Sequence, residues 1–146
     1  MPDPNIVIED LILHRDRMKL VDAVVEIDEH HCLCQTTITE RWPLQIAGNV
    51  RSVIIVELVA QSAGILLKWR LRHEQQQGGA GWLVGVRNAT FKVQSIPRGV
   101  TLGIMSTLLL MRGNYATVLG VVRAGDHVVG QVEVQVFRPE QTPLDF

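Results

Sequence analysis

The chain has 146 residues and a mass of 16.3 kDa, so we expect one domain over residues 1–146 that builds its core without disulfides. Hydrophobic residues make up 47% of the sequence and charged residues 20%, a composition that excludes a disordered chain. The formal net charge of −1 excludes the strongly basic surface on which nucleic-acid binding depends.

Two strands are predicted in the first third of the chain. Lys19–Ile27 is rich in valine, and Cys32–Thr39 alternates and contains three threonines, as is typical of strands. Asp28-Glu29-His30 is the predicted turn between them. A loop is then expected over Arg41–Asn49, which contains Trp42-Pro43 and Gly48-Asn49.

Cys32 and Cys34 lie on the second predicted strand. We expect their side chains to leave opposite faces of that strand, which opposes a disulfide between them. For the same reason we expect no metal site from these thiols and His30 and His31, although the residue types suit zinc. Free thiols and the absence of a recognisable secretory signal in residues 1–8 favour a reducing compartment, and we expect a cytoplasmic protein.

A long helix is predicted from Val50 to about His73. It is apolar on nearly every side, which is typical of a buried helix, although the β-branched run Val53–Val56 favours a strand. The apolar run Val53–Leu67 is interrupted by polar residues and is too short to cross a bilayer, so no membrane contact is expected.

The remainder of the chain is predicted to form strands. These are Trp82–Val93, Val100–Met111, Ala116–Val122 and His127–Phe137, separated by turns that contain glycine. Two strands, one long helix and four strands indicate an α+β fold with the helix packed on an antiparallel sheet. The strand edges that such a sheet leaves free favour a dimer.

Three segments resemble one family, the 3-hydroxyacyl-acyl-carrier-protein dehydratases. Leu11–Ile27 contains His14-Arg15 and a Leu-Val-Asp strand, Ile55–Gly64 reads IVELVAQSAG, and Gly85–Lys92 reads GVRNATFK. They occur in the family's order and span most of the chain. The resemblance implies the hotdog fold, in which an antiparallel β-sheet wraps around one long central helix.

One part of the family's site is not in its usual place. In the dehydratases, a loop before the helix supplies a catalytic histidine and the helix supplies an acid. Residues 42–51 read WPLQIAGNVR and contain no histidine, whereas Glu57 keeps the place of the acid. The chain therefore resembles a divergent branch of dehydratase-like hotdog proteins with a rebuilt loop.

The candidate catalytic residues are Glu57 and His14. Burial in an apolar helix would make Glu57 a usable acid or base. Gln61 follows at i+4 on the same helix face, where it can orient the Glu57 carboxylate or bind the substrate. His14 is the histidine within a family-matching motif. The alternatives are a structural carboxylate at Glu57 and a structural bridge at His14.

The predicted start of the helix gives the candidate substrate-binding residues. Free N–H groups at a helix N-terminus attract negative charge, so Gly48, Asn49, Val50 and Arg51 are candidates for polarising a thioester carbonyl. The alternative is an ordinary loop in which Asn49 caps the helix.

The resemblance implies an acyl-thioester enzyme that dehydrates 3-hydroxy chains of fatty-acyl or polyketide type. The carrier is acyl carrier protein or coenzyme A, no metal or cofactor is expected, and the assembly is a homodimer or a higher oligomer built from dimers. Two alternatives remain: an acyl-thioester hydrolase, which needs one carboxylate and a helix N-terminus, and a non-catalytic subunit that binds acyl carriers or a competent partner.

Overall fold

A computed structural model describes residues 6–8, 18–74 and 82–138. In chain order the elements are β1 (Ala23–Ile27), β2 (His31–Thr37), β3 (Gln45–Ile46), β4 (Asn49–Arg51), α1 (Ile54–His73), β5 (Trp82–Phe91), β6 (Ser95–Pro97), β7 (Thr101–Arg112), β8 (Tyr115–Ala124) and β9 (His127–Phe137).

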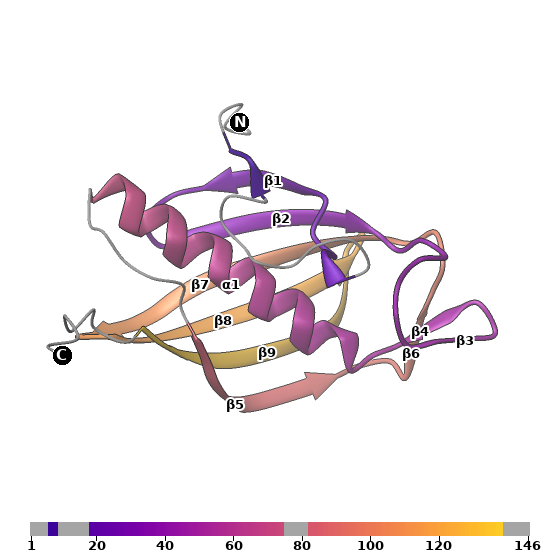
Figure 1. The fold of residues 1–146 in the computed structure, drawn as a ribbon. Helices are drawn as coiled ribbons and strands as arrows, with labels where there is room; N and C mark the ends of the chain where they lie inside the picture. The colour runs from indigo at the N-terminus through magenta and orange to yellow at the C-terminus, as the bar shows by residue number, and fades with distance from the viewer. Residues whose placement is uncertain (1–5, 9–17, 75–81, 139–146) are drawn as a thin grey trace, which may run out of the picture.

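The main sheet has six strands in the order β1-β2-β7-β8-β9-β5, and every neighbouring pair is antiparallel. The helix α1 runs diagonally across one face of this sheet, with β1 and β5 at the two edges (Figure 1). A second, three-stranded sheet in the order β3-β4-β6 lies beyond the first turn of the helix. This arrangement confirms the predicted α+β class with one helix on an antiparallel sheet.

The face of the sheet that meets the helix follows the alternation of the sequence. In β9, Val132, Val134 and Val136 are buried while the residues between them are more exposed. Successive side chains of a strand point to opposite faces, so one face of β9 is continuously apolar. The helix packs Leu58, Val59 and other buried apolar residues against this face, and together they form one core.

Two glycines let the helix approach the sheet closely. A Cβ atom at Gly120 in β8 would lie 2.5 Å from both methyl carbons of Val59. At Gly130 in β9 it would lie 2.8 Å from Ile55 Cδ1 and 3.0 Å from the carbonyl oxygen of Thr90. These distances are shorter than side-chain contacts allow, so both positions need glycine for the observed packing.

Three short strands and the helix start differ from the sequence prediction. The helix begins at Ile54, four residues after the predicted Val50, and Asn49–Arg51 form β4 instead. Residues 45–51 form a hairpin whose turn is made by Ala47 and Gly48 at φ 51° and 81°. Strands of two and three residues carry no detectable alternation, and β4 exists because Val50 pairs with the distant Ile96.

The helix α1 lacks an uncharged apolar stretch of the length that a membrane span requires, and the described residues contain no other helix of comparable length.

Candidate active site

The helix start leaves two backbone N–H groups without an acceptor among the described residues. Ile55 N donates to Ser52 O at 2.9 Å and Val56 N donates to Val53 O at 3.1 Å, whereas Val53 N and Ile54 N have no such partner there. The N-cap residue, Val53, makes no side-chain cap. A helix start of this kind presents donors and a partial positive charge to an anionic or polarised oxygen.

Ser52 is the residue type that usually caps a helix, but it is used otherwise here. Its Oγ donates to the carbonyl oxygen of Val93 at 2.5 Å, and its backbone N–H donates to Gln94 O at 3.1 Å. These bonds fasten the helix start to the segment between β5 and β6. They explain why the first turn lacks a side-chain acceptor.

The backbone groups predicted to lie at the helix start are occupied elsewhere. Arg51 N donates to Leu44 O within the β3–β4 hairpin, and the Asn49 side chain donates to Ala47 O instead of capping the helix. The helix-start donors are therefore Val53 and Ile54, and the assignment of this role to residues 48–51 was wrong. It failed because residues 49–51 pair as a strand and Gly48 lies in the turn before that strand.

An open groove of about 690 Å³ lies beside the helix start. Asn49, Arg51, Ser52 and Val53 line one side of it, and Phe91 to Ser95 line the other. Of the predicted binding residues, Asn49 and Arg51 reach this groove. Gly48 and Gln61 are not among its lining residues, and Val50 is fully buried in the core.

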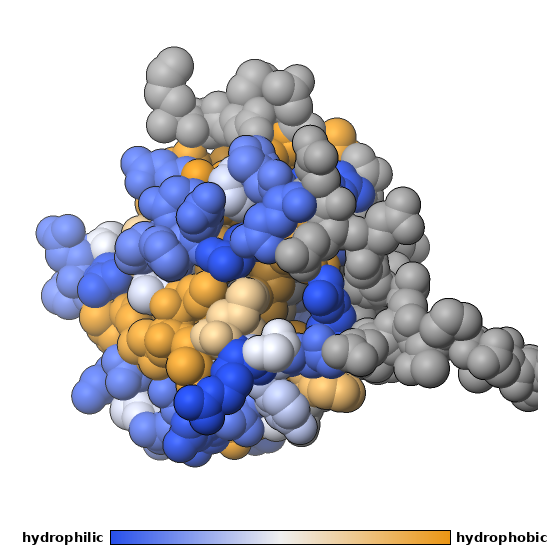
Figure 2. Space-filling model, turned by 90° about the vertical axis from the view of Figure 1, so that its left-hand side faces the viewer, coloured by the Kyte–Doolittle hydropathy of each residue, from blue (hydrophilic) through white to orange (hydrophobic). Residues whose placement is uncertain are grey.

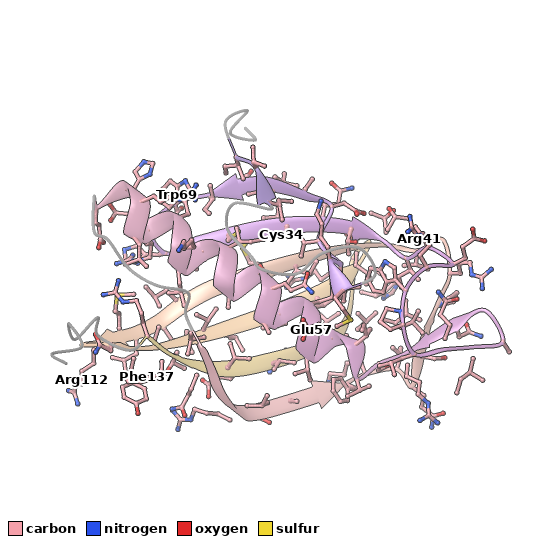
Figure 3. All side chains as sticks on the ribbon, in the orientation of Figure 1. Cys34, Arg41, Glu57, Trp69, Arg112 and Phe137 are labelled. Atoms are coloured by element: carbon pink, nitrogen blue, oxygen red, sulfur yellow. The ribbon has the colours of Figure 1, made fainter. Side chains whose placement is uncertain are left out.

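Glu57 lies one turn into the helix, at the end of the molecule where the small sheet is found (Figure 3). Its carboxylate Oε1 accepts a hydrogen bond from Gln61 Nε2 at 3.1 Å. Glu57 follows Val53 at i+4, so it lies one helical turn after the free N–H groups, and it is not among the residues that line the groove.

Gln61 is fully buried and fixes three groups at once. Its Oε1 accepts from Leu20 N at 3.0 Å, and its Nε2 donates to Met18 O at 2.5 Å as well as to Glu57. The predicted i+4 contact between Gln61 and Glu57 is thus present. The amide joins the helix to the segment that enters β1 and holds the carboxylate in one orientation.

His14, the second candidate catalytic residue, lies outside the described residues. The histidines that are described occupy other places: His30 and His31 follow the end of β1, His73 ends the helix and His127 begins β9. None of them lines the groove beside the helix start.

The two cysteines correct a prediction. Residues two apart on a strand point to the same face, and Cys32 and Cys34 are both buried with their Sγ atoms 3.5 Å apart. Both are free thiols. The hydrogen bond between them lowers the pKa of Cys34 and raises the pKa of Cys32, and Ser62 Oγ also donates to Cys34 Sγ at 3.5 Å.

Comparison with known proteins agrees with this architecture. A family model described as ApeP dehydratase, of the ApeP-like family, matches residues 6–145. The 3-hydroxyacyl-[acyl-carrier-protein] dehydratase FabZ of Streptococcus uberis is 32% identical over 117 residues, which cover 76% of this chain and 80% of that protein.

Solved structures share the fold. The dehydratase heterocomplex ApeI:P from Xenorhabdus doucetiae contains a chain with a TM-score of 0.82 at 21% identity, covering 99% of this chain and 95% of that one. The protein smu.793 from Streptococcus mutans, bound to acetyl CoA, has a TM-score of 0.65 at 16% identity, covering 80% and 86%. A family match over nearly the whole chain, together with the sequence identity to FabZ, shows that this protein belongs to the ApeP-like family of hotdog-fold dehydratases.

Proposed function

We propose that this protein dehydrates 3-hydroxyacyl thioesters carried on acyl carrier protein, with chains of fatty-acyl or polyketide type. The observation that carries the proposal is the first two turns of α1. Two acceptor-free N–H groups, at Val53 and Ile54, lie within one helical turn of Glu57, whose carboxylate Gln61 holds. The carrier and the substrate follow from the similarity to FabZ.

The reaction removes a proton from C2 and the hydroxyl from C3, and the electrons of the C2–H bond form the C2–C3 double bond. The N–H groups of Val53 and Ile54 would stabilise the charge that develops on the thioester oxygen. Glu57 would protonate the departing hydroxyl, which leaves as water. Asn49 and Arg51, which line the groove, are proposed to contact the substrate or its carrier.

Dehydration needs a second group to accept the C2 proton. We assign this role to His14, since residues 42–51 contain no histidine and His14 is the histidine within the motif that resembles the dehydratases. The acid and the base would then come from different segments of the chain.

We propose a homodimer, or a higher oligomer built from dimers, as the working assembly. Among the described residues, the outer edge of β5 has no neighbouring strand in the main sheet, and Val86, Phe91 and Val93 on and after it are exposed at 44%, 39% and 37%. An unpaired edge beside exposed apolar side chains favours pairing with another chain. The two free, buried cysteines fit a reducing compartment such as the cytoplasm.

A non-catalytic subunit is the second candidate. It is favoured by the missing loop histidine and by the similarity to a chain of a dehydratase heterocomplex. In that case this chain would bind acyl carriers or support a competent partner. Thioester hydrolysis is the third, since Glu57 and a helix N-terminus suffice to activate water and polarise a carbonyl.

The deciding experiment is intact mass spectrometry of carrier-bound 3-hydroxyacyl chains incubated with the pure protein. Loss of one water, abolished in Glu57→Gln and His14→Gln and retained in the exposed control Glu40→Gln, would establish the dehydratase. Loss of the whole acyl group would establish a thioesterase. An unchanged substrate across short and long chains would reject both activities for the isolated protein, and the assay would then be repeated with a hotdog dehydratase subunit from the same organism.

A further inference from the structure

A second cavity lies at the opposite end of the helix from the candidate active site. Its volume is about 200 Å³, and its walls come from the last turns of α1, the β7–β8 turn and the end of β9. Figure 2 looks onto this end of the molecule and shows an apolar area bordered by polar side chains. All of the residues that line the cavity belong to the described part of the chain.

Two arginines line this cavity, and each has a buried nitrogen that lacks a partner. Among the described side chains, the buried nitrogen and oxygen atoms without a hydrogen-bond partner are Arg70 Nε and Arg138 Nη1. Both residues belong to the same cavity lining. A buried N–H without an acceptor loses its hydration and gains nothing in return, so two of them in one cavity indicate a missing acceptor.

The rest of the Arg70 guanidinium is fixed. Its Nη1 donates to the carbonyl oxygen of Glu29, and its Nη2 lies 3.3 Å from Glu74 Oε1. Only 12% of the Arg70 side chain is exposed. Arg138 is held through its backbone, whose N–H donates to Asn114 O at 2.8 Å. The Arg70 donor is thus positioned before any ligand arrives, which lowers the entropic cost of binding.

The charge of the lining selects the head group of the ligand. Arg70 and Arg138 are cationic and Glu74 is anionic, so the lining carries one net positive charge, which one monoanionic group neutralises. A carboxylate offers two oxygens and accepts one N–H from each guanidinium, whereas a phosphate dianion would leave the site with excess negative charge.

The other walls of the cavity are apolar and favour a ligand whose remaining part, apart from the carboxylate, is a hydrocarbon. Leu67, Leu71 and Val136 line the cavity together with Met111 and Ala116. An engineered apolar cavity of about 150 Å³ holds benzene, so a cavity of this size suits a body of roughly six to eight carbons. We propose that this cavity binds small carboxylic acids with such a body, through Arg70 and Arg138, at a site separate from the proposed active site.

The test is isothermal titration of the full-length protein with octanoate, with 1-octanol as the uncharged match and octyl phosphate as the dianionic one. We expect one octanoate per chain, with binding at least tenfold weaker for 1-octanol and for octyl phosphate. Arg138→Gln should lower the octanoate affinity at least tenfold. Arg112→Gln removes an exposed arginine at the end of β7 that does not line the cavity, and it should leave the affinity unchanged.

Three results would overturn the proposal: no octanoate binding at millimolar concentration, equal binding by the wild type and Arg138→Gln, or loss of binding in Glu57→Gln. The last result would show that octanoate binds in the proposed active site. Because Arg70 also bonds Glu29 and Glu74, Arg70→Gln is used only after its unfolding midpoint has been shown to match that of the wild type. In that case it should also lower the octanoate affinity at least tenfold, and an unchanged affinity would count against the proposal.

Discussion

Gln61 Nε2 lies 3.1 Å from Glu57 Oε1 and 2.5 Å from the carbonyl oxygen of Met18, so one buried amide ties the proposed acid to the segment that enters β1. The same side chain accepts from Leu20 N at 3.0 Å. The orientation of Glu57 is therefore coupled to the packing of residues 18–20, which lead into β1, against the helix.

Gln61→Leu should destabilise the protein by about 1–3 kcal/mol, because it leaves the buried Leu20 N without an acceptor and removes the donor to Met18 O. Urea unfolding at a fixed protein concentration measures the loss. Gln61→Glu keeps an acceptor for Leu20 N but sets a second carboxylate against Glu57. Its loss of stability should be larger at pH 8 than at pH 5, and a loss independent of pH would contradict the contact.

Gly120→Ala should destabilise the protein by about 1–3 kcal/mol, because the added Cβ would meet Val59 at 2.5 Å. Val59→Ala removes the methyl groups that it meets, so the double variant should lose less than the sum of the single losses. Gly85→Ala is the matched control, since its Cβ would meet nothing within 4 Å. Additive losses at positions 59 and 120 would show that the helix does not approach β8 this closely.

The thiols of Cys32 and Cys34 should react with N-ethylmaleimide far more slowly in the native protein than in denaturant, because both are buried. Under native conditions, Cys34 should be alkylated before Cys32, since the hydrogen bond between the two thiols lowers the pKa of the Cys34 thiol. Peptide mass spectrometry of singly labelled protein identifies the site. Single labels found mainly on Cys32 would refute this order.

Asp28→Asn should weaken the β1–β2 turn by less than ~1 kcal/mol at neutral pH, since the site is exposed. Asp28 Oδ1 accepts from the backbone N–H groups of His30 and His31 at 2.8 and 2.7 Å, which lowers the pKa of this carboxyl. A lowered folded-state pKa stabilises the fold above the unfolded value of about 3.9, and the gain is lost as the pH falls through the folded value.

The difference between Asp28→Asn and the wild type should therefore shrink as the pH falls below about 4, and it should vanish once the folded-state carboxyl is protonated. Thermal unfolding of both proteins from pH 7 to pH 2 measures it. A difference that persists at the lowest pH would mean that the charge of Asp28 is not what stabilises the turn.

The sequence by itself determined the main elements of the fold. Alternating Val132, Val134 and Val136 predicted β9, and the long apolar segment around Leu58 predicted α1. Both predictions succeeded because a half-buried strand and a buried helix each leave a recognisable local pattern of apolar residues. The i+4 spacing likewise predicted the contact between Gln61 and Glu57, since the helix alone sets that distance.

Only the tertiary structure decided the helix start, the partners of the cysteines and the second cavity. Residues 49–51 form a strand because Val50 pairs with Ile96, which is distant in sequence. The helix therefore begins later than predicted, and its free N–H groups are those of Val53 and Ile54. Arg70 and Arg138 line one cavity because the helix ends beside the β7–β8 turn and the end of β9. Such placements depend on contacts between distant segments, which no local pattern encodes.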